Sequence, residues 1–367
     1  MIACLLASGC DSEKNRRKER SYVQEVLSAG RDDAQFEKAT VPRPFLFPED
    51  AGPHPRFRSE WWYYTGNLET ADRRQFGYQL TIFRQALTGT AVQSRSKWRT
   101  NQLYMGHFAV TDVRNDRFHS SSRMARGAVG LAGAHAIPYR VWLEDWEISG
   151  SYRLPRIRAK EDTVAIDLAL ESKKAEVFQG EQGLSVKSAG VGNASYYYSQ
   201  TRLETTGTVA IDGRTFPVSG LSWLDHEWST SSLGKGEIGW DWFSLQLDDG
   251  REMMLYGIRK KDGTYSSFSS GSLILADGEK VPLTRKEFRI AVLDFWTSPQ
   301  TRIRYPSRWK IAIAKADLEM EITPLVANQE HRHNFVYWEG AVSARGRNAA
   351  GKGYAELVGY GKVLEKR

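Results

Sequence analysis

Short runs of alternating apolar and polar residues follow one another from Val41 onward, with turn signals every 8–14 residues. Clear runs lie at 75–84, 164–170, 244–247, 252–258 and 309–313. Alternation with period two is typical of strands that bury one face. Asp-Gly pairs that begin at positions 212, 249, 262 and 277 indicate tight hairpins. No long segment has the 3.6-residue period of a helix, so the pattern predicts an all-β sandwich or barrel.

An aromatic pattern occurs twice along the chain. Trp61-Trp62-Tyr63-Tyr64-Thr65 is matched 179 residues later by Trp240-Asp241-Trp242-Phe243-Ser244. Each motif is followed by a polar turn and then by an apolar strand that ends in Arg, at Arg84 and Arg259. A repeat over this distance predicts two copies of one domain type, although two unrelated Trp-rich hairpins would look the same. A chain of 367 residues is also longer than one core usually holds.

The composition supports β structure, because 12% of the residues are aromatic and 32 are glycine. The first ten residues are apolar and end in small residues before Cys10, which resembles a bacterial lipobox whose Cys is acylated. An ordinary buried N-terminal segment is the alternative. No basic residue precedes this run, so we expect the start codon to lie upstream.

Residues 11–40 contain seven basic and seven acidic residues and few apolar ones. Such a segment buries too little apolar surface to fold alone, and it indicates a polar tether. We therefore expect a lipoprotein signal and lipobox at 1–10, a tether at 11–40, and a protein anchored by lipid at Cys10. It would lie in the cell envelope, on the periplasmic or extracellular side of a bacterial membrane.

The formal net charge is +7, and it falls on the globular part because the tether is neutral. A basic surface could meet anionic lipid headgroups, or the excess could be scattered. We find no nucleic-acid-binding motif and expect no nucleic-acid partner. No later run reaches 18 consecutive apolar residues.

Distinctive motifs follow in a fixed order, and they lie at 47–55, 60–68, 106–112, 222–229, 239–243, 337–342 and 353–357. Over about residues 40–365 this set resembles the AttH and hydroxyneurosporene synthase (carotenoid 1,2-hydratase) family, often labelled predicted secreted hydrolases. The resemblance implies two lipocalin-like (calycin-type) antiparallel β-barrel domains packed together, with a boundary near 215–235. We expect an N-terminal domain at 41–225 and a C-terminal domain at 226–367.

The densest group of titratable residues in an aromatic setting is Asp225-His226-Glu227-Trp228. On a strand, Asp225 and Glu227 share one face, and His226 and Trp228 share the other. A His beside a Trp suits acid chemistry on an alkene, because the aromatic face stabilises the developing cation. The family's His-x-Trp maps onto His226 and Trp228. The resemblance implies protonation of an isoprenoid double bond, capture of the cation by water and a downstream acid, for which Asp241 is the nearest candidate.

Glu60 precedes the first aromatic strand and could face a cavity or cap the barrel base. We predict that His226, Trp228, Asp241 and Glu60 are catalytic and converge on a cavity near the junction of the lobes. Ligand contacts are expected from neighbouring acidic, aromatic and imidazole groups, namely Asp225, Glu227, Trp61, Trp240, Trp242 and His107. The alternative is a buried polar network that clamps the lobes, with Arg58 or Arg84 as partners.

Other motifs are weaker. The G-x-G-x-x-G at 234–239 is followed by an aromatic strand and not by a helix, which argues against a dinucleotide-binding role. The chain contains no G-x-S-x-G and no H-E-x-x-H. His331 and His333 could share one face of a strand and bind a metal, but the polar run 328–334 favours a loop. We therefore expect no cofactor and no metal.

Two functions remain open. One is an enzyme that adds water to a hydrophobic small molecule, or hydrolyses one. The other is a non-catalytic, lipocalin-type carrier that holds a lipid or similar ligand near the membrane and works with an ABC transporter. Convergence of the candidate side chains on one pocket would favour the enzyme.

Overall fold

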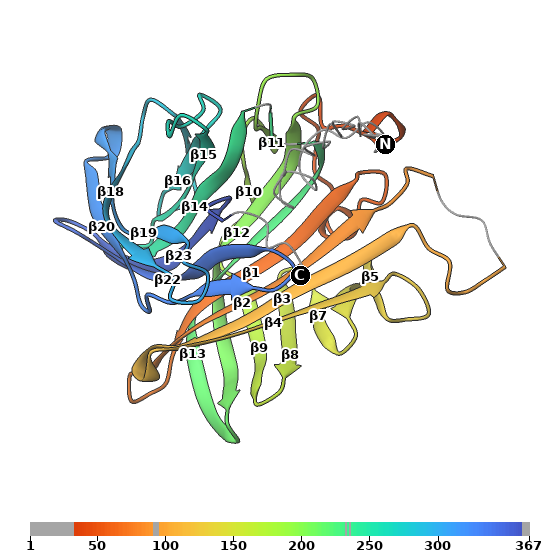
Figure 1. Cartoon of the computed structure of the whole chain (residues 1–367), viewed down its shortest axis with the longest axis horizontal. Helices are drawn as coiled ribbons and strands as arrows, with labels where there is room; N and C mark the ends of the chain where they lie inside the picture. Colours follow the sequence, from red (N-terminus) through yellow and green to blue (C-terminus); the bar gives the residue numbers. More distant parts are fainter. Residues whose placement is uncertain (1–32, 91–94, 232, 235, 362–367) are drawn as a thin grey trace, which may run out of the picture.

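The computed structural model describes residues 33–90, 95–231, 233–234 and 236–361, and it confirms an all-β fold with two antiparallel, barrel-like sheets (Figure 1). Cys10 and most of the expected tether lie outside the described residues. The helices in the described ranges are single 3-10 turns: η1 (Asp33–Gln35), η2 (Glu49–Ala51), η3 (Val113–Asn115) and η4 (Ala314–Ala316). None of them is long or apolar enough to cross a membrane.

The first sheet has 13 strands in the order β4-β3-β2-β1-β13-β12-β9-β8-β7-β6-β5, and β10 and β11 pair with β12. The strands are β1 (Ser59–Glu69), β2 (Gln75–Ala86), β3 (Gln102–Asp112), β4 (Arg117–Arg126), β5 (Ala132–His135), β6 (Tyr139–Leu143), β7 (Trp146–Ser151), β8 (Leu154–Glu161), β9 (Val164–Ser172), β10 (Val177–Phe178), β11 (Leu184–Val186), β12 (Ala194–Ile211) and β13 (Arg214–Ser231).

The second sheet has 10 strands in the order β17-β16-β15-β14-β23-β22-β20-β19-β18, and β21 pairs with β22. The strands are β14 (Glu237–Leu247), β15 (Glu252–Lys260), β16 (Ser270–Ile274), β17 (Lys280–Thr284), β18 (Arg289–Thr297), β19 (Arg304–Ile313), β20 (Leu318–Pro324), β21 (Glu330–Arg332), β22 (Val336–Gly346) and β23 (Ala350–Val358).

The two lobes share one topology, as the aromatic repeat predicts. β1 pairs with the next strand, β2, and with the last strand of its sheet, β13. β14 likewise pairs with β15 and with β23. In both lobes the short extra strands pair with the penultimate strand, β12 or β22. Trp61 and Trp240 therefore lie on equivalent opening strands.

The passage from one sheet to the other falls between Ser231 and Glu237, a few residues after the division at 225/226 expected from the sequence. β13 runs on through this division because it pairs continuously with β1 and with β12 over residues 225–229. His226 and Trp228 consequently belong to the first lobe.

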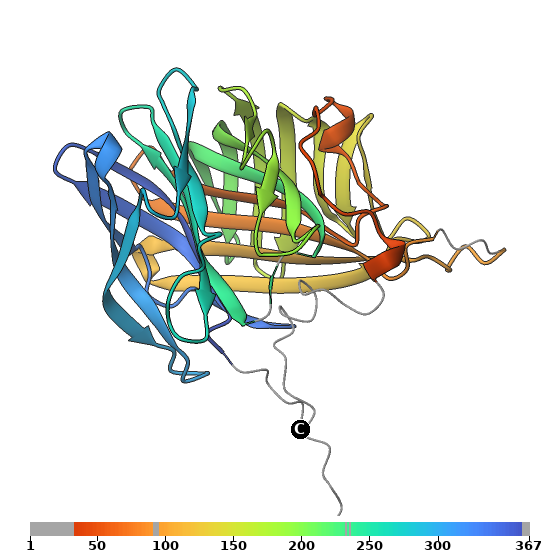
Figure 2. The ribbon, with the colours of Figure 1, turned by 90° about the horizontal axis from the view of Figure 1, so that it is seen from above.

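Each lobe has its own apolar core, and a third cluster joins them. This junction is largely aromatic, with Tyr63, Tyr197, Trp223, Trp242 and Tyr256 among its buried members. The lobes lie side by side in both views (Figures 1 and 2). They approach closely at Gly77, where a Cβ atom would lie 2.7 Å from both the Ala341 Cβ and the Tyr354 hydroxyl.

The segment before β1 packs against the first lobe (Figure 2). Ala39, Ala51 and Phe57 are buried in its core, and the Phe45 ring lies 5.4 Å from the Trp228 ring. This packing brings His54 against the residues of β1 and β13.

Candidate functional site

The alternation of β13 divides the Asp225–Trp228 motif between two environments. Asp225 and Glu227 line a pocket between the lobes. Trp228 belongs to the core of the first lobe, and His226 lies on the same inner face of the strand. Both faces are buried, since one packs inside its own barrel and the other packs against the second lobe.

The pocket has a volume of about 170 Å³ and a mostly apolar wall. It is lined by residues of β1, β2, β3, β4, β12 and β13 of the first lobe and of β14, β15 and β23 of the second. Aromatic side chains from both lobes form much of the wall: Trp61, Tyr63, Phe83, Tyr197, Trp240, Trp242, Tyr256 and Phe335. An apolar pocket with a few polar groups at a domain junction is typical of a small-molecule site.

Asp225 is a buried carboxyl group in this pocket. It accepts hydrogen bonds from the Tyr197 hydroxyl at 2.5 Å, the Ser199 hydroxyl at 2.6 Å and the Trp223 indole at 2.7 Å. Burial, reinforced by the nearby charge of Glu227, outweighs these bonds and raises the pKa of Asp225 to about 7. Asp225 can therefore exchange a proton near neutral pH.

Glu356 on β23 is a second such carboxyl group. The Trp240 indole donates to its Oε2 at 2.7 Å, and no described residue bonds its Oε1. Burial, with the charges of Asp225 and Glu227, raises the pKa of Glu356 to about 7. Glu356 is not among the site residues predicted from the sequence, although it lies in the motif at 353–357.

Lys187 provides the pocket with a positive charge. Its Nζ lies 3.2 Å from Glu227 Oε1 and 4.2 Å from the centre of the Tyr256 ring. Burial opposes the charged form, but the negative charge of Glu227 raises the pKa of Lys187 above its usual value. Lys187 and Tyr197 belong to none of the distinctive motifs, so no local pattern in the sequence identifies them as pocket residues.

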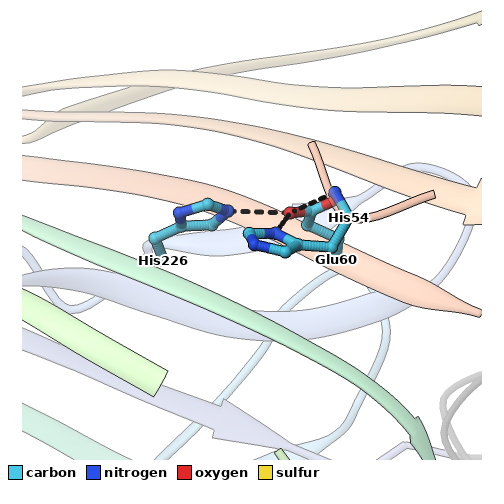
Figure 3. A group of neighbouring side chains, drawn as sticks. All are labelled: His54, Glu60 and His226. Carbon is cyan, nitrogen blue, oxygen red and sulfur yellow. Dashed lines mark hydrogen bonds and ion pairs between the residues drawn. The ribbon is translucent and has the colours of Figure 1, made fainter. Parts of the chain in front are cut away.

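His226 takes part in a second, separate cluster around Glu60 (Figure 3). Oε1 of Glu60 accepts hydrogen bonds from His54 Nδ1 at 2.7 Å and from His226 Nε2 at 2.9 Å. Oε2 of Glu60 accepts from Arg84 Nε at 2.7 Å. Burial alone would favour a neutral Glu60, but Arg84 and the histidines hold its pKa well below the usual value. Glu60 is thus a fully bonded, ionised carboxylate.

His54 links this cluster to the segment before β1. Its Nε2 lies 2.9 Å from Asp50 Oδ1, and its ring stacks on Trp228 at 3.6 Å. Burial disfavours the imidazolium, but Glu60 and Asp50 on its two sides raise the pKa of His54. For His226, burial dominates and lowers the pKa. These contacts hold the segment against the first lobe. The alternative considered from the sequence was a polar network that clamps the two lobes together, whereas this network lies within one lobe and includes Arg84.

The ligand atoms of His54, Glu60 and His226 all lie within 4.8 Å of one another, as a metal site would require. The donor set does not fit a divalent cation. Glu60 already accepts bonds from both imidazoles and from Arg84, and the buried guanidinium would repel a metal ion at the same carboxylate. We therefore derive no chemistry from a metal here.

Asp241 lies apart from His226. It follows Trp240 on β14, so it points to the opposite face and into the second lobe. There it accepts hydrogen bonds from Tyr265 at 2.6 Å and Tyr360 at 2.9 Å, and it pairs with Arg259 at 3.0 Å.

The predicted convergence of His226, Trp228 and Asp241 on one cavity is wrong, because strand alternation turns each of them away from the pocket. Of the expected catalytic set, Glu60 borders the pocket. Of the expected ligand contacts, Asp225, Glu227, Trp61, Trp240 and Trp242 line it. His107 lies beyond the wall, with Nδ1 2.8 Å from the Tyr337 hydroxyl.

Comparison with known proteins places this chain in a family. The family model described as AttH-like matches residues 38–360. A crystal structure of a putative AttH from Nitrosomonas europaea is 33% identical, with a TM-score of 0.79 over 89% of this chain and 100% of that chain.

Kievitone hydratase from Fusarium solani subsp. phaseoli is 21% identical over 215 residues, which is 55% of this chain and 59% of that protein. The crystal structure of kievitone hydratase from Nectria haematococca has a TM-score of 0.66 at 15% identity, over 90% of this chain and 98% of that chain, and shows the shared fold. The narrower resemblance to carotenoid 1,2-hydratase stays a prediction. On the extent of the family match, the chain belongs to the AttH-like family.

Proposed function

We propose that this protein is a hydratase that adds water to a carbon–carbon double bond of an apolar small molecule held between its lobes. One observation carries the proposal: Asp225 and Glu356 combine pKa values of about 7 with an aromatic, apolar pocket. Groups with this pKa can both give and take a proton at neutral pH. The named activity of a distant relative, kievitone hydratase, supports the same reaction type.

Glu356 is suited to the role of general acid. Trp240 holds one carboxylate oxygen, which leaves Oε1 to carry the proton that is given to an alkene carbon. A new C–H bond forms as the π bond breaks, and the neighbouring carbon becomes cationic. The faces of Trp61 and Trp242 can stabilise this cation, since aromatic rings attract positive charge.

Asp225 is suited to the role of general base. In its ionised form it accepts a proton from the water whose oxygen bonds to the cation, so the products are an alcohol and a protonated Asp225. A proton passed back to Glu356 through solvent restores the starting state. Because two nearby carboxylates repel one another, the pair favours a single shared proton, which gives one acid and one base.

We also propose, from the lipobox-like run before Cys10, that the protein is exported and anchored by lipid in the cell envelope. A carrier that works with an ABC transporter would need the same location, and turnover distinguishes the two functions.

The experiment is to incubate the purified protein with kievitone and with short isoprenoid alcohols such as geraniol in ¹⁸O-labelled water. Mass spectrometry should then find an adduct of one labelled water. Glu356→Gln and Asp225→Asn should each lower turnover by roughly 10²-fold or more and retain ligand binding. Asp249→Asn, a change in a surface hairpin, is the matched control. Binding of these probes without any adduct would favour the carrier and contradict the hydratase.

A further inference from the structure

Three histidines from the two lobes meet beside the pocket, and the proposed mechanism uses none of them. His107 lies on β3 of the first lobe, His331 lies on β21 of the second lobe, and His333 follows two residues later. The sequence-based preference for a loop at 328–334 is therefore wrong for His331, which belongs to a short strand paired with β22. We propose that His107, His331 and His333 form a site for one late first-row divalent metal ion, such as Co²⁺, Ni²⁺, Cu²⁺ or Zn²⁺.

The three rings form a nearly equilateral triangle. Their centres are 5.7 Å apart for His107 and His331, 6.3 Å for His107 and His333, and 6.3 Å for His331 and His333. Tetrahedral Zn–N bonds of about 2.0–2.1 Å would place imidazole centres roughly 5 Å apart. Unlike the ligand atoms of the Glu60 cluster, the donor nitrogens of these three histidines do not all lie within 4.8 Å of one another, so metal binding requires the rings to rotate toward a common point.

Unpaired nitrogens give the second reason. His107 and His331 are completely buried, yet within the described ranges His107 Nε2 and both ring nitrogens of His331 have no hydrogen-bond partner. Buried polar atoms are nearly always bonded, so an unpaired set calls for a missing partner such as an ion. A metal bound by His107 Nε2 and one nitrogen of His331 would satisfy two of the three atoms at once.

The surroundings suit metal coordination. His107 and His331 are completely buried, and burial favours the neutral form of an imidazole, which is the form that binds metals. With its Nδ1–H donating to the Tyr337 hydroxyl at 2.8 Å, His107 presents the lone pair of Nε2. The Glu60 cluster differs, because there Arg84 already neutralises the carboxylate.

A metal at this site would join the two lobes directly, since His107 belongs to one sheet and His331 and His333 to the other. Imidazole ligands suit Co²⁺, Ni²⁺, Cu²⁺ and Zn²⁺, with affinity rising toward Cu²⁺. Binding should therefore stabilise the folded chain in proportion to metal concentration.

The test uses untagged, chelator-treated full-length protein titrated with Co²⁺ and Zn²⁺. We expect one equivalent to bind, with the visible absorption of tetrahedral Co²⁺ and a rise in the melting temperature. His107→Ala and His331→Ala should each weaken binding by at least about tenfold. His333 is partly exposed, so the His333→Ala variant should fold normally. It can therefore test metal binding even if His107→Ala or His331→Ala does not fold.

His135→Ala, which removes an exposed histidine elsewhere on the first lobe, is the matched control and should bind as the unaltered protein does. Absence of stoichiometric binding would overturn the proposal. Binding that survives His333→Ala and His331→Ala, or binding that is lost in Glu60→Gln instead, would also overturn it.

Discussion

The Trp240 indole donates a hydrogen bond to Oε2 of Glu356 over 2.7 Å, between the opening strand and the last strand of the second lobe. This bond stabilises the ionised carboxylate and limits the rise in the pKa of Glu356 that burial causes. The pair thus joins a residue of the aromatic repeat to a carboxyl group that is not among the site residues predicted from the sequence.

Trp240→Phe should raise the pKa of Glu356 further, because it removes a bond that favours the ionised form. The pH at which the hydration rate falls on the alkaline side of its profile should rise by roughly half to one pH unit. Measurement of kcat/KM against pH checks this, with Trp61→Phe as the control from the same wall. An unchanged alkaline limb in Trp240→Phe would argue against Glu356 as the acid.

Asp225→Asn should change how stability depends on pH. The folded-state pKa of Asp225, about 7, is above its unfolded value, so the folded chain holds this proton more tightly between about pH 4 and pH 7. The stability that this group contributes is present below pH 4 and declines as pH rises to 7. The Asn variant lacks this decline, so relative to the unaltered chain it should gain up to roughly 4 kcal/mol between pH 4 and pH 8. Urea unfolding at pH 4 and at pH 8 measures the difference in the free energy of unfolding between the variant and the unaltered chain. The same difference at both pH values would refute the expectation.

His226→Ala should act on stability and leave the chemistry largely intact. The change removes a donor to the buried Glu60 carboxylate and leaves a cavity beneath Trp62, on which the His226 ring stacks at 4.8 Å. We expect a loss of roughly 2–4 kcal/mol in the free energy of unfolding. The folded fraction should keep its turnover within a few-fold, because His226 points away from the pocket. Loss of turnover without loss of melting temperature would restore the catalytic role predicted from the sequence.

Cys10→Ser should release the protein from membranes, since acyl chains contribute about 0.8 kcal/mol per buried CH₂ to anchoring. Cell fractionation should find the unaltered protein in the membrane pellet and the variant in the soluble fraction. Cys4→Ser is the matched control and should stay in the pellet. A Cys10→Ser protein that remains in the pellet after a high-salt wash would contradict lipid anchoring.

The sequence by itself determined the β class, the repeated lobe and the division of Asp225–Trp228 into two faces, because each depends on local periodicity. It also identified several residues that line the pocket, among them Asp225, Glu227, Trp61, Trp240 and Trp242. Which face meets the pocket was decided only by the tertiary structure. Both faces of β13 are buried over residues 222–230, so local hydrophobicity does not distinguish the lobe interior from the junction. Glu356 and Lys187 reach Asp225 and Glu227 only through strand pairing and packing across long stretches of chain, and no local pattern in the sequence records those contacts.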